Sequence, residues 1–98
     1  MDEYLNAYLR RQLVLGHDVH KHHEQAIRNS RPIPPIGCQV AARPPIAVTA
    51  SVVWARDGLE LIDATADAWS GRDVLVAMRD VRWTTLGVWL AAQDARRR

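Results

Sequence analysis

The chain has 98 residues, of which 48% are hydrophobic and 24% charged, with a formal net charge of +2. This length predicts one small domain, and the composition excludes a wholly disordered chain. Up to Asp94, ten basic residues meet eleven acidic ones, so the positive balance comes from the final three arginines. The basic charge therefore lies in a tail and not on a face.

Three features predict a cytoplasmic protein with no membrane association. The first residues, Met-Asp-Glu-Tyr, carry neither a basic start nor a hydrophobic signal region. The longest apolar run, residues 46–55, is too short to span a bilayer. A single cysteine, Cys38, excludes an internal disulfide and is expected to be a free buried thiol in a reducing compartment.

Residues 1–30 are predicted to form an amphipathic helix. Asp2 and Glu3 complement the positive end of a helix dipole, and the residue before Pro32 is pushed out of helical geometry. Apolar side chains recur at helical spacing along this segment. The stripe that we expect to bind a protein partner, or a second copy of the chain, consists of Leu5, Tyr8, Leu9, Leu13 and Val19. The alternative is that the helix packs on its own domain.

Residues 31–45 contain all five prolines and predict an extended linker. Within it, residues 39–42 could form a short edge strand, because proline is tolerated at strand ends.

From residue 46 onward the apolar residues alternate with a period of two, which predicts β-strands. Asp57-Gly58 is a strong hairpin signal, and Ser70-Gly71 predicts the next turn. The expected strands cover residues 46–55, 59–69, 74–78 and 83–90, followed by a helical turn and a frayed tail. Counting residues 39–42 gives about five strands, so residues 46–98 are predicted to form a small antiparallel SH3-like β-barrel. With the helix, the predicted fold class is α+β.

The four tryptophans are expected to fill the core of this barrel, because the chain has no phenylalanine and a small domain needs large buried side chains. Trp83 is the expected exception, since it follows a polar turn.

Candidate catalytic and metal sites are weak. His17, His20 and Glu24 fall within one sector of the predicted helix and could contribute to a zinc site, but the chain offers no further histidine beyond the helix. The acidic residues of the predicted barrel suit turns and surface positions. We therefore expect no enzyme activity, no cofactor and no small-molecule substrate.

An alternative function is nucleic-acid binding by arginines of the turns and tail, with one exposed aromatic side chain. Interleaved aspartates at positions 73, 80 and 94 oppose this reading. The candidate residues are Arg72, Arg79, Arg82, Trp83, Arg96, Arg97 and Arg98.

Three stretches, "VVWARDG", "AWSGRDVLV" and "GVWLAAQDARRR", resemble short proteins of actinobacteria and their phages. The resemblance covers residues 43–98 and implies a small barrel with an arginine-rich tail, usually without an assigned activity. It transfers no site residue. Together these features predict a non-enzymatic accessory protein that acts as a protein-interaction module in a host cytoplasm. Nucleic-acid binding and a structural role in a phage particle are the alternatives.

Overall fold

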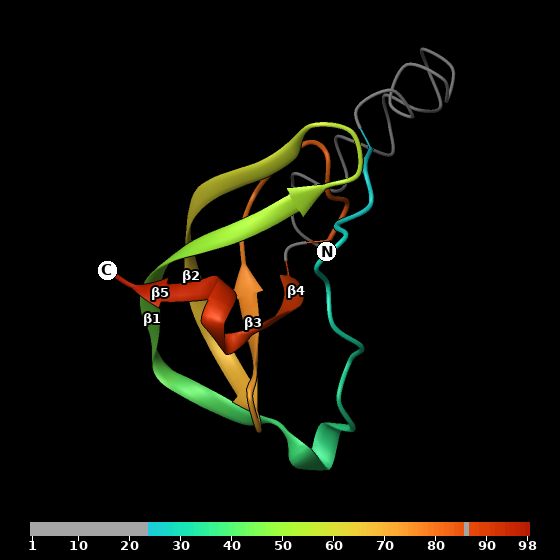
Figure 1. Cartoon of the computed structure of the whole chain (residues 1–98). Helices are drawn as coiled ribbons and strands as arrows, with labels where there is room; N and C mark the ends of the chain where they lie inside the picture. Colours follow the sequence, from blue (N-terminus) through green and yellow to red (C-terminus); the bar gives the residue numbers. More distant parts are fainter. Residues whose placement is uncertain (1–23, 86) are drawn as a thin grey trace, which may run out of the picture.

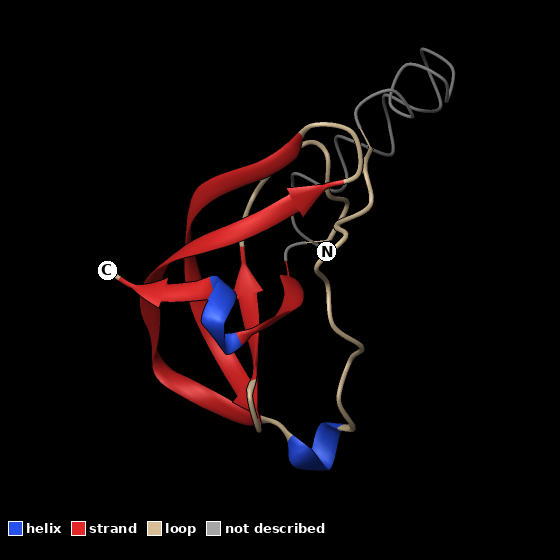
Figure 2. Ribbon diagram, in the orientation of Figure 1, coloured by secondary structure: helices blue, strands red, loops and turns tan. Residues whose placement is uncertain are grey.

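The computed structural model describes residues 24–85 and 87–98. Their core is a strongly curved five-stranded antiparallel sheet with the strand order β4-β3-β2-β1-β5 (Figure 1). The strands are β1 (Val40–Trp54), β2 (Gly58–Ser70), β3 (Asp73–Ala77), β4 (Gly87–Ala91) and β5 (Ala95–Arg97). Two short 3₁₀ turns, η1 (Ile36–Cys38) and η2 (Ala92–Asp94), are the only helical segments of the described chain (Figure 2).

The predicted α+β class is therefore wrong for the described residues, which contain strands and two 3₁₀ turns but no α-helix. The predicted helix also ends too late, because residues 24–30 are not helical. Within this segment Ile27 forms a β-bridge to Trp54, and Ser30 forms one to Leu90. The remainder of the predicted helix, residues 1–23, lies outside the described residues.

The sheet has five strands, but they are not the five that the sequence predicts. Residues 39–42 were expected to form a separate edge strand, whereas residues 40–54 run as one strand with an irregularity between Ala41 and Ile46. The cis peptide bond Arg43-Pro44 lies in that irregularity. The fifth strand is the C-terminal tail, because β5 pairs with residues 48–50 of β1 instead of fraying.

The β1–β2 hairpin follows the alternation of the sequence. Its turn spans residues 55–57, and Gly58 has a φ of +75°, a left-handed conformation that glycine adopts without steric strain. Since Trp54 pairs with Gly58, even-numbered residues of the two strands share one face and odd-numbered residues the other. The even face is the buried one, as Val52, Trp54 and Ala64 show.

The segment before the linker closes the open side of the sheet. The backbone N–H of Arg28 donates to the Val53 carbonyl over 2.7 Å, and that of Arg31 donates to the Trp89 carbonyl over 2.7 Å. Between them the Asn29 side chain makes the hydrogen bonds that a neighbouring strand would make to β1. Its Nδ2 donates to the Ser51 carbonyl over 2.8 Å, and its Oδ1 accepts from the Val53 N–H over 2.9 Å. Residues 26–31 therefore belong to the folded unit and bridge β1 to β4.

The hydrophobic core lies inside this curved sheet. Trp54, Leu90, Val52 and Val76 are its largest fully buried side chains. Contrary to the sequence prediction, the exposed tryptophan is Trp69, which is 42% exposed, and Trp83 packs against the core. Cys38 was expected to be buried but is exposed in η1.

Candidate binding surfaces

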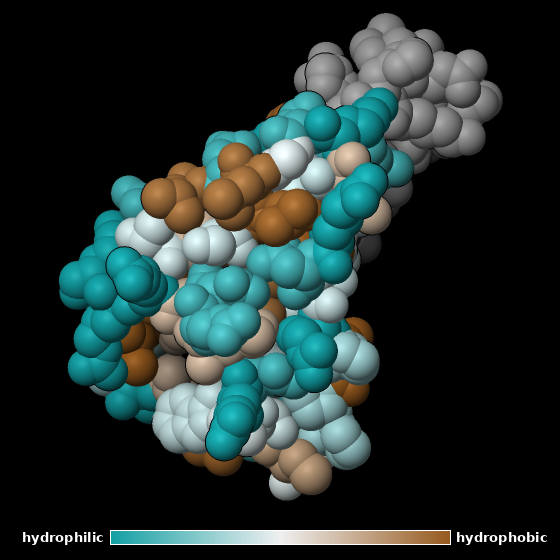
Figure 3. Space-filling model, in the orientation of Figure 1, coloured by the Kyte–Doolittle hydropathy of each residue, from teal (hydrophilic) through white to brown (hydrophobic). Residues whose placement is uncertain are grey.

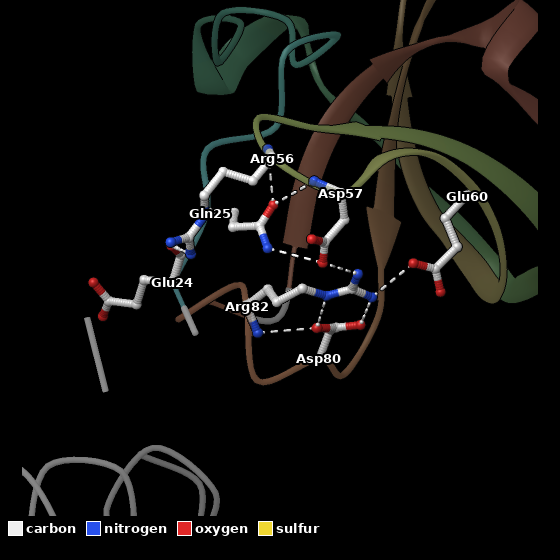
Figure 4. Close-up of polar contacts among 7 residues, drawn as sticks. All are labelled: Glu24, Gln25, Arg56, Asp57, Glu60, Asp80 and Arg82. Carbon is white, nitrogen blue, oxygen red and sulfur yellow. Dashed lines mark hydrogen bonds and ion pairs between the residues drawn. The ribbon is translucent and has the colours of Figure 1, made fainter. Parts of the chain in front are cut away.

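One polar cluster, centred on Arg82, lies at the end of the sheet where the β1–β2 turn meets the loop after β3 (Figure 4). The guanidinium forms ion pairs with three carboxylates: Asp80 at 2.7 Å, Glu60 at 2.8 Å and Asp57 at 3.0 Å. Its central carbon lies 4.1 Å from the centroid of the Trp54 ring, a cation–π contact. Arg82 therefore covers the buried tryptophan and ties two loops together.

A second residue, Gln25, extends this cluster to the N-terminal segment. Its Nε2 donates to Asp57 over 2.9 Å, while its Oε1 accepts from the backbone N–H groups of Arg56 and Asp57 over 3.0 and 3.1 Å. Its own backbone N–H donates to the Arg82 carbonyl over 2.9 Å. Through its side chain and its backbone N–H, this one residue thus joins the N-terminal segment to the β1–β2 turn and to the loop after β3.

The hydrogen bonds in this cluster explain its protonation. The Arg82 side chain lowers the pKa of Asp80 against the opposing effect of burial. The side chains of Gln25 and Arg82 lower the pKa of Asp57. The same carboxylates, led by Asp80, raise the pKa of Arg82. All of these charges are stabilised by one another, so the cluster suits a structural role and presents no activated acid or base.

The residues predicted to bind nucleic acid do not gather on one surface. Arg82 is occupied by its carboxylates, and the Trp83 indole donates to the Gly87 carbonyl over 3.0 Å. Arg72 lies in the β2–β3 turn and Arg79 in the loop after β3, both exposed. In the tail, Arg96 and Arg97 belong to β5 and pair with β1. Arg98 follows β5, and its side chain donates to the Val48 carbonyl.

Of the three weak metal candidates, only Glu24 lies in the described part of the chain. Glu24 is half-buried, and its carbonyl accepts from Arg56 over 2.9 Å. His17 and His20 lie outside the described residues, as do the five members of the predicted helical stripe, Leu5, Tyr8, Leu9, Leu13 and Val19. No cluster of three potential ligands occurs among residues 24–85 and 87–98. In the same residues no helix has the length and hydrophobicity to cross a membrane.

Two surfaces that the sequence analysis missed are more distinctive. The first is an apolar patch on the β1–β2 hairpin, visible as a brown area over the upper part of these strands (Figure 3). Its largest exposed side chains are Leu59 and Leu61, 68% and 66% exposed. The second is a hollow of about 310 Å³ beside the exposed Trp69, at the opposite end of β2.

The hairpin itself contained the signal for the first surface. Once Trp54 is paired with Gly58, the odd-numbered residues of β2 near the turn must face outward. Leu59 and Leu61 are both odd-numbered, and both are exposed. Trp69 follows the register shift between Ala66 and Ala68, so this alternation does not extend to it.

No protein family, curated protein or solved structure matches this chain. The resemblance to short proteins of actinobacteria and their phages therefore stays a prediction.

Proposed function

We propose that the protein is a non-enzymatic interaction module that binds an extended segment of a partner protein along residues 59–63 of β2. The observation that carries the proposal is the pair of exposed leucines on a strand whose outer edge is unpaired among the described residues. Leu59 and Leu61 present their side chains side by side on the outer face of β2. Exposed apolar patches of this kind mark interaction sites.

The direction of the backbone groups supports the same reading. On β1, the outward N–H and C=O groups belong to odd-numbered residues, since Val53 bonds to Arg28 and to the Asn29 side chain. Paired residues of an antiparallel ladder point their polar backbone groups either toward each other or both away. Val53 is paired with Leu59 and Ser51 with Leu61. The N–H and C=O groups of Leu59 and Leu61 therefore point away from β1.

On that outer side β3 does not extend far enough to bond to the N–H and C=O groups of Leu59 and Leu61. The pairing of β2 with β3 starts at Thr65 and continues toward Ser70. Between positions 59 and 63 no other described backbone segment pairs with this edge. An unpaired strand edge accepts a further strand by main-chain hydrogen bonding, and side chains at alternate positions give specificity.

The charge around the leucines indicates the chemistry of the partner. Asp57, Glu60 and Asp63 flank them and are all exposed. Asp57 and Glu60 share one cation, Arg82, with Asp80, and Asp63 pairs with Arg98 at 3.7 Å, so four carboxylates meet two cations here and negative charge remains in excess. A second copy of the same edge would bring these acidic groups together, which opposes self-association. A partner strand with apolar residues at alternate positions and basic residues beside them complements the surface.

The test is a capture experiment with the full-length chain and two substitutions at one position. Leu61→Pro removes an N–H that faces the open edge, so it blocks strand addition while the ladder to β1 keeps its hydrogen bonds. Leu61→Val keeps that N–H and serves as the matched control. We expect a basic partner segment to be captured by the wild type and by Leu61→Val but lost with Leu61→Pro, provided that all three proteins give the same circular dichroism. Equal capture by all three would refute strand addition at this edge.

The predicted helix remains a separate proposal, tested by deleting residues 1–23. A deletion of residues 1–30 would also remove Gln25, Ile27 and Asn29, which belong to the folded unit. Loss of the same partner on deletion of residues 1–23 would assign the contact to the helical stripe. Retention of the partner would assign it to β2.

A further inference from the structure

A second surface, at the other end of β2, has the features of a small-ligand site. The hollow of about 310 Å³ is lined by Trp69, by its cross-strand neighbour Val74 and by further aliphatic side chains, including Ile46. Its base consists of small residues of β2, Ala66 and Ala68, which leave space inside the curved sheet. Ligand pockets start at about 300 Å³, so this hollow suits a small organic molecule.

The bulge of β2 explains why the hollow forms at this place. The register of β2 shifts between Ala66 and Ala68 on the side of β3, and on the side of β1 the irregularity lies opposite the same point. A bulge bends its strand and separates the neighbouring side chains. Trp69 directly follows this bend and lies at the rim.

The charge at the rim is uniformly positive. Among the described residues that line the hollow, Arg97 is the only charged one. A neighbouring hollow of about 420 Å³ shares Trp69 and Arg97 and adds Arg43 and Arg98, and none of its described lining residues is acidic. Arg98 is engaged by the Val48 and Ala64 carbonyls, at 3.0 and 3.2 Å. For Arg43 and Arg97 no ion pair occurs within the described chain.

The residues that line the hollow favour an aliphatic carboxylate over a nucleotide as the bound anion. Among the described residues that line the smaller hollow, all but Arg97 are apolar or glycine, and the Trp69 indole N–H is the only other polar side-chain group. A nucleobase would bury most of its polar edge there without partners, which is unfavourable. A hydrocarbon chain has no polar groups that burial in such a lining would leave without hydrogen-bond partners, and burying its apolar surface is favourable. A guanidinium binds a carboxylate with two parallel hydrogen bonds.

We propose that this hollow binds an aliphatic carboxylate, with its chain against Trp69 and its carboxylate at the Arg97 and Arg43 guanidinium groups. Because the site lies at the opposite end of β2 from Leu59 and Leu61, the proposal is independent of partner-strand binding. The two arginines come from β1 and β5, which pair with each other through residues 48–50. A bound carboxylate would therefore link the tail strand to the irregular part of β1.

The test is a titration of the full-length protein with octanoate, followed by the indole N–H signal of Trp69 in two-dimensional nitrogen–proton NMR. We expect a saturable shift of this signal, with the three other indole signals moving less. Octanol, which has the same chain without the charge, should bind at least about tenfold more weakly. No saturable shift of the Trp69 signal with octanoate would overturn the proposal.

Two substitutions on β5 provide the matched pair. Arg97 lines the hollow, whereas Arg96 is its neighbour on the same strand and lines neither hollow. Arg97→Gln should weaken octanoate binding at least about tenfold, and Arg96→Gln should leave it unchanged. Equal effects of the two substitutions would refute a specific contact. A mixed-sequence oligonucleotide that shifts the Trp69 signal when octanoate does not would overturn the proposal in favour of nucleic-acid binding.

Discussion

Replacement of Arg82 by methionine tests whether its cluster stabilises the fold. Methionine keeps much of the length and apolar character of the arginine stem but removes the guanidinium. The substitution breaks the ion pairs with Asp80, Glu60 and Asp57 and the cation–π contact with Trp54. The Asp80 side chain, only 17% exposed, loses its ion pair with Arg82.

The expected loss follows from that burial. Removing one partner of a buried ion pair costs about 3 to 5 kcal/mol, and exposed pairs contribute about 0 to 1 kcal/mol. The Asp80 and Arg82 side chains are largely buried, while those of Asp57 and Glu60 are about half exposed. We therefore expect Arg82→Met to lower the free energy of unfolding by about 3 kcal/mol, which includes the lost cation–π contact. For a domain of this size, that corresponds to a decrease in Tm of roughly 12 to 24 °C.

The assay is urea denaturation followed by tryptophan fluorescence, with Arg79→Met as the control. Arg79 lies in the same loop, three residues before Arg82, and is exposed. Its replacement should change the free energy of unfolding by less than about 0.5 kcal/mol. An Arg82→Met protein within that margin of the wild type would refute the structural role of the cluster.

Of four further predictions, the first concerns the pH dependence of the same cluster and the others concern other parts of the fold. The lowered pKa of Asp80 means that its stabilisation is present above the ordinary carboxyl value of 3.8 and is lost as the pH falls below it, so acid titration of unfolding should be less steep for Asp80→Asn than for the wild type. Asn29→Ala leaves the Ser51 carbonyl and the Val53 N–H without their partner and should lower the free energy of unfolding by about 2 kcal/mol, measured in urea. Gly58→Ala, at a φ of +75°, should lower it by about 1 to 2 kcal/mol, and an unchanged value would contradict the turn geometry. Deletion of residues 96–98 removes most of β5 and the hydrogen bonds of Arg98, so a loss of about 2 to 4 kcal/mol is expected, whereas a frayed tail would give none.

The sequence predicted the long hairpin well, because two local signals agree there. The alternation from Ile46 to Trp54 and the Asp57-Gly58 turn together determine both the register and the buried face. The same reasoning places Leu59 and Leu61 on the outer face, but it does not reach Trp69, which follows the register shift between Ala66 and Ala68. The prediction that the tryptophans other than Trp83 fill the core rested on size alone and was wrong for Trp69.

Other features depend on contacts between distant segments, which periodicity does not reveal. Residues 24–30 continue the predicted helical stripe, yet Ile27 is buried and forms an isolated β-bridge to Trp54, followed by a turn at residues 28–29. The tertiary pairing outweighs the local preference for a helix at this place. The arginine tail likewise has no strand signal of its own and is ordered by its pairing with β1.

The candidate surfaces were difficult to predict for the same reason. The sequence predicted Arg82 as a nucleic-acid-binding residue. In the structure its guanidinium forms ion pairs with three carboxylates from separate parts of the chain. The rim of the Trp69 hollow combines Arg43 and Arg97, which are far apart in the sequence. Only the fold brings these residues together.

Amide hydrogen exchange along β2 tests the central claim most directly, because it reports on single backbone groups. In the free protein, the amides of Leu59, Leu61 and Asp63 should exchange faster than those of Glu60 and Ile62, which face β1. Binding of the partner should slow exchange at the three odd positions and leave the even positions unchanged. If the odd amides were already as protected as the even ones in the free protein, or if the partner left them unprotected, the open edge of β2 would not be the binding site.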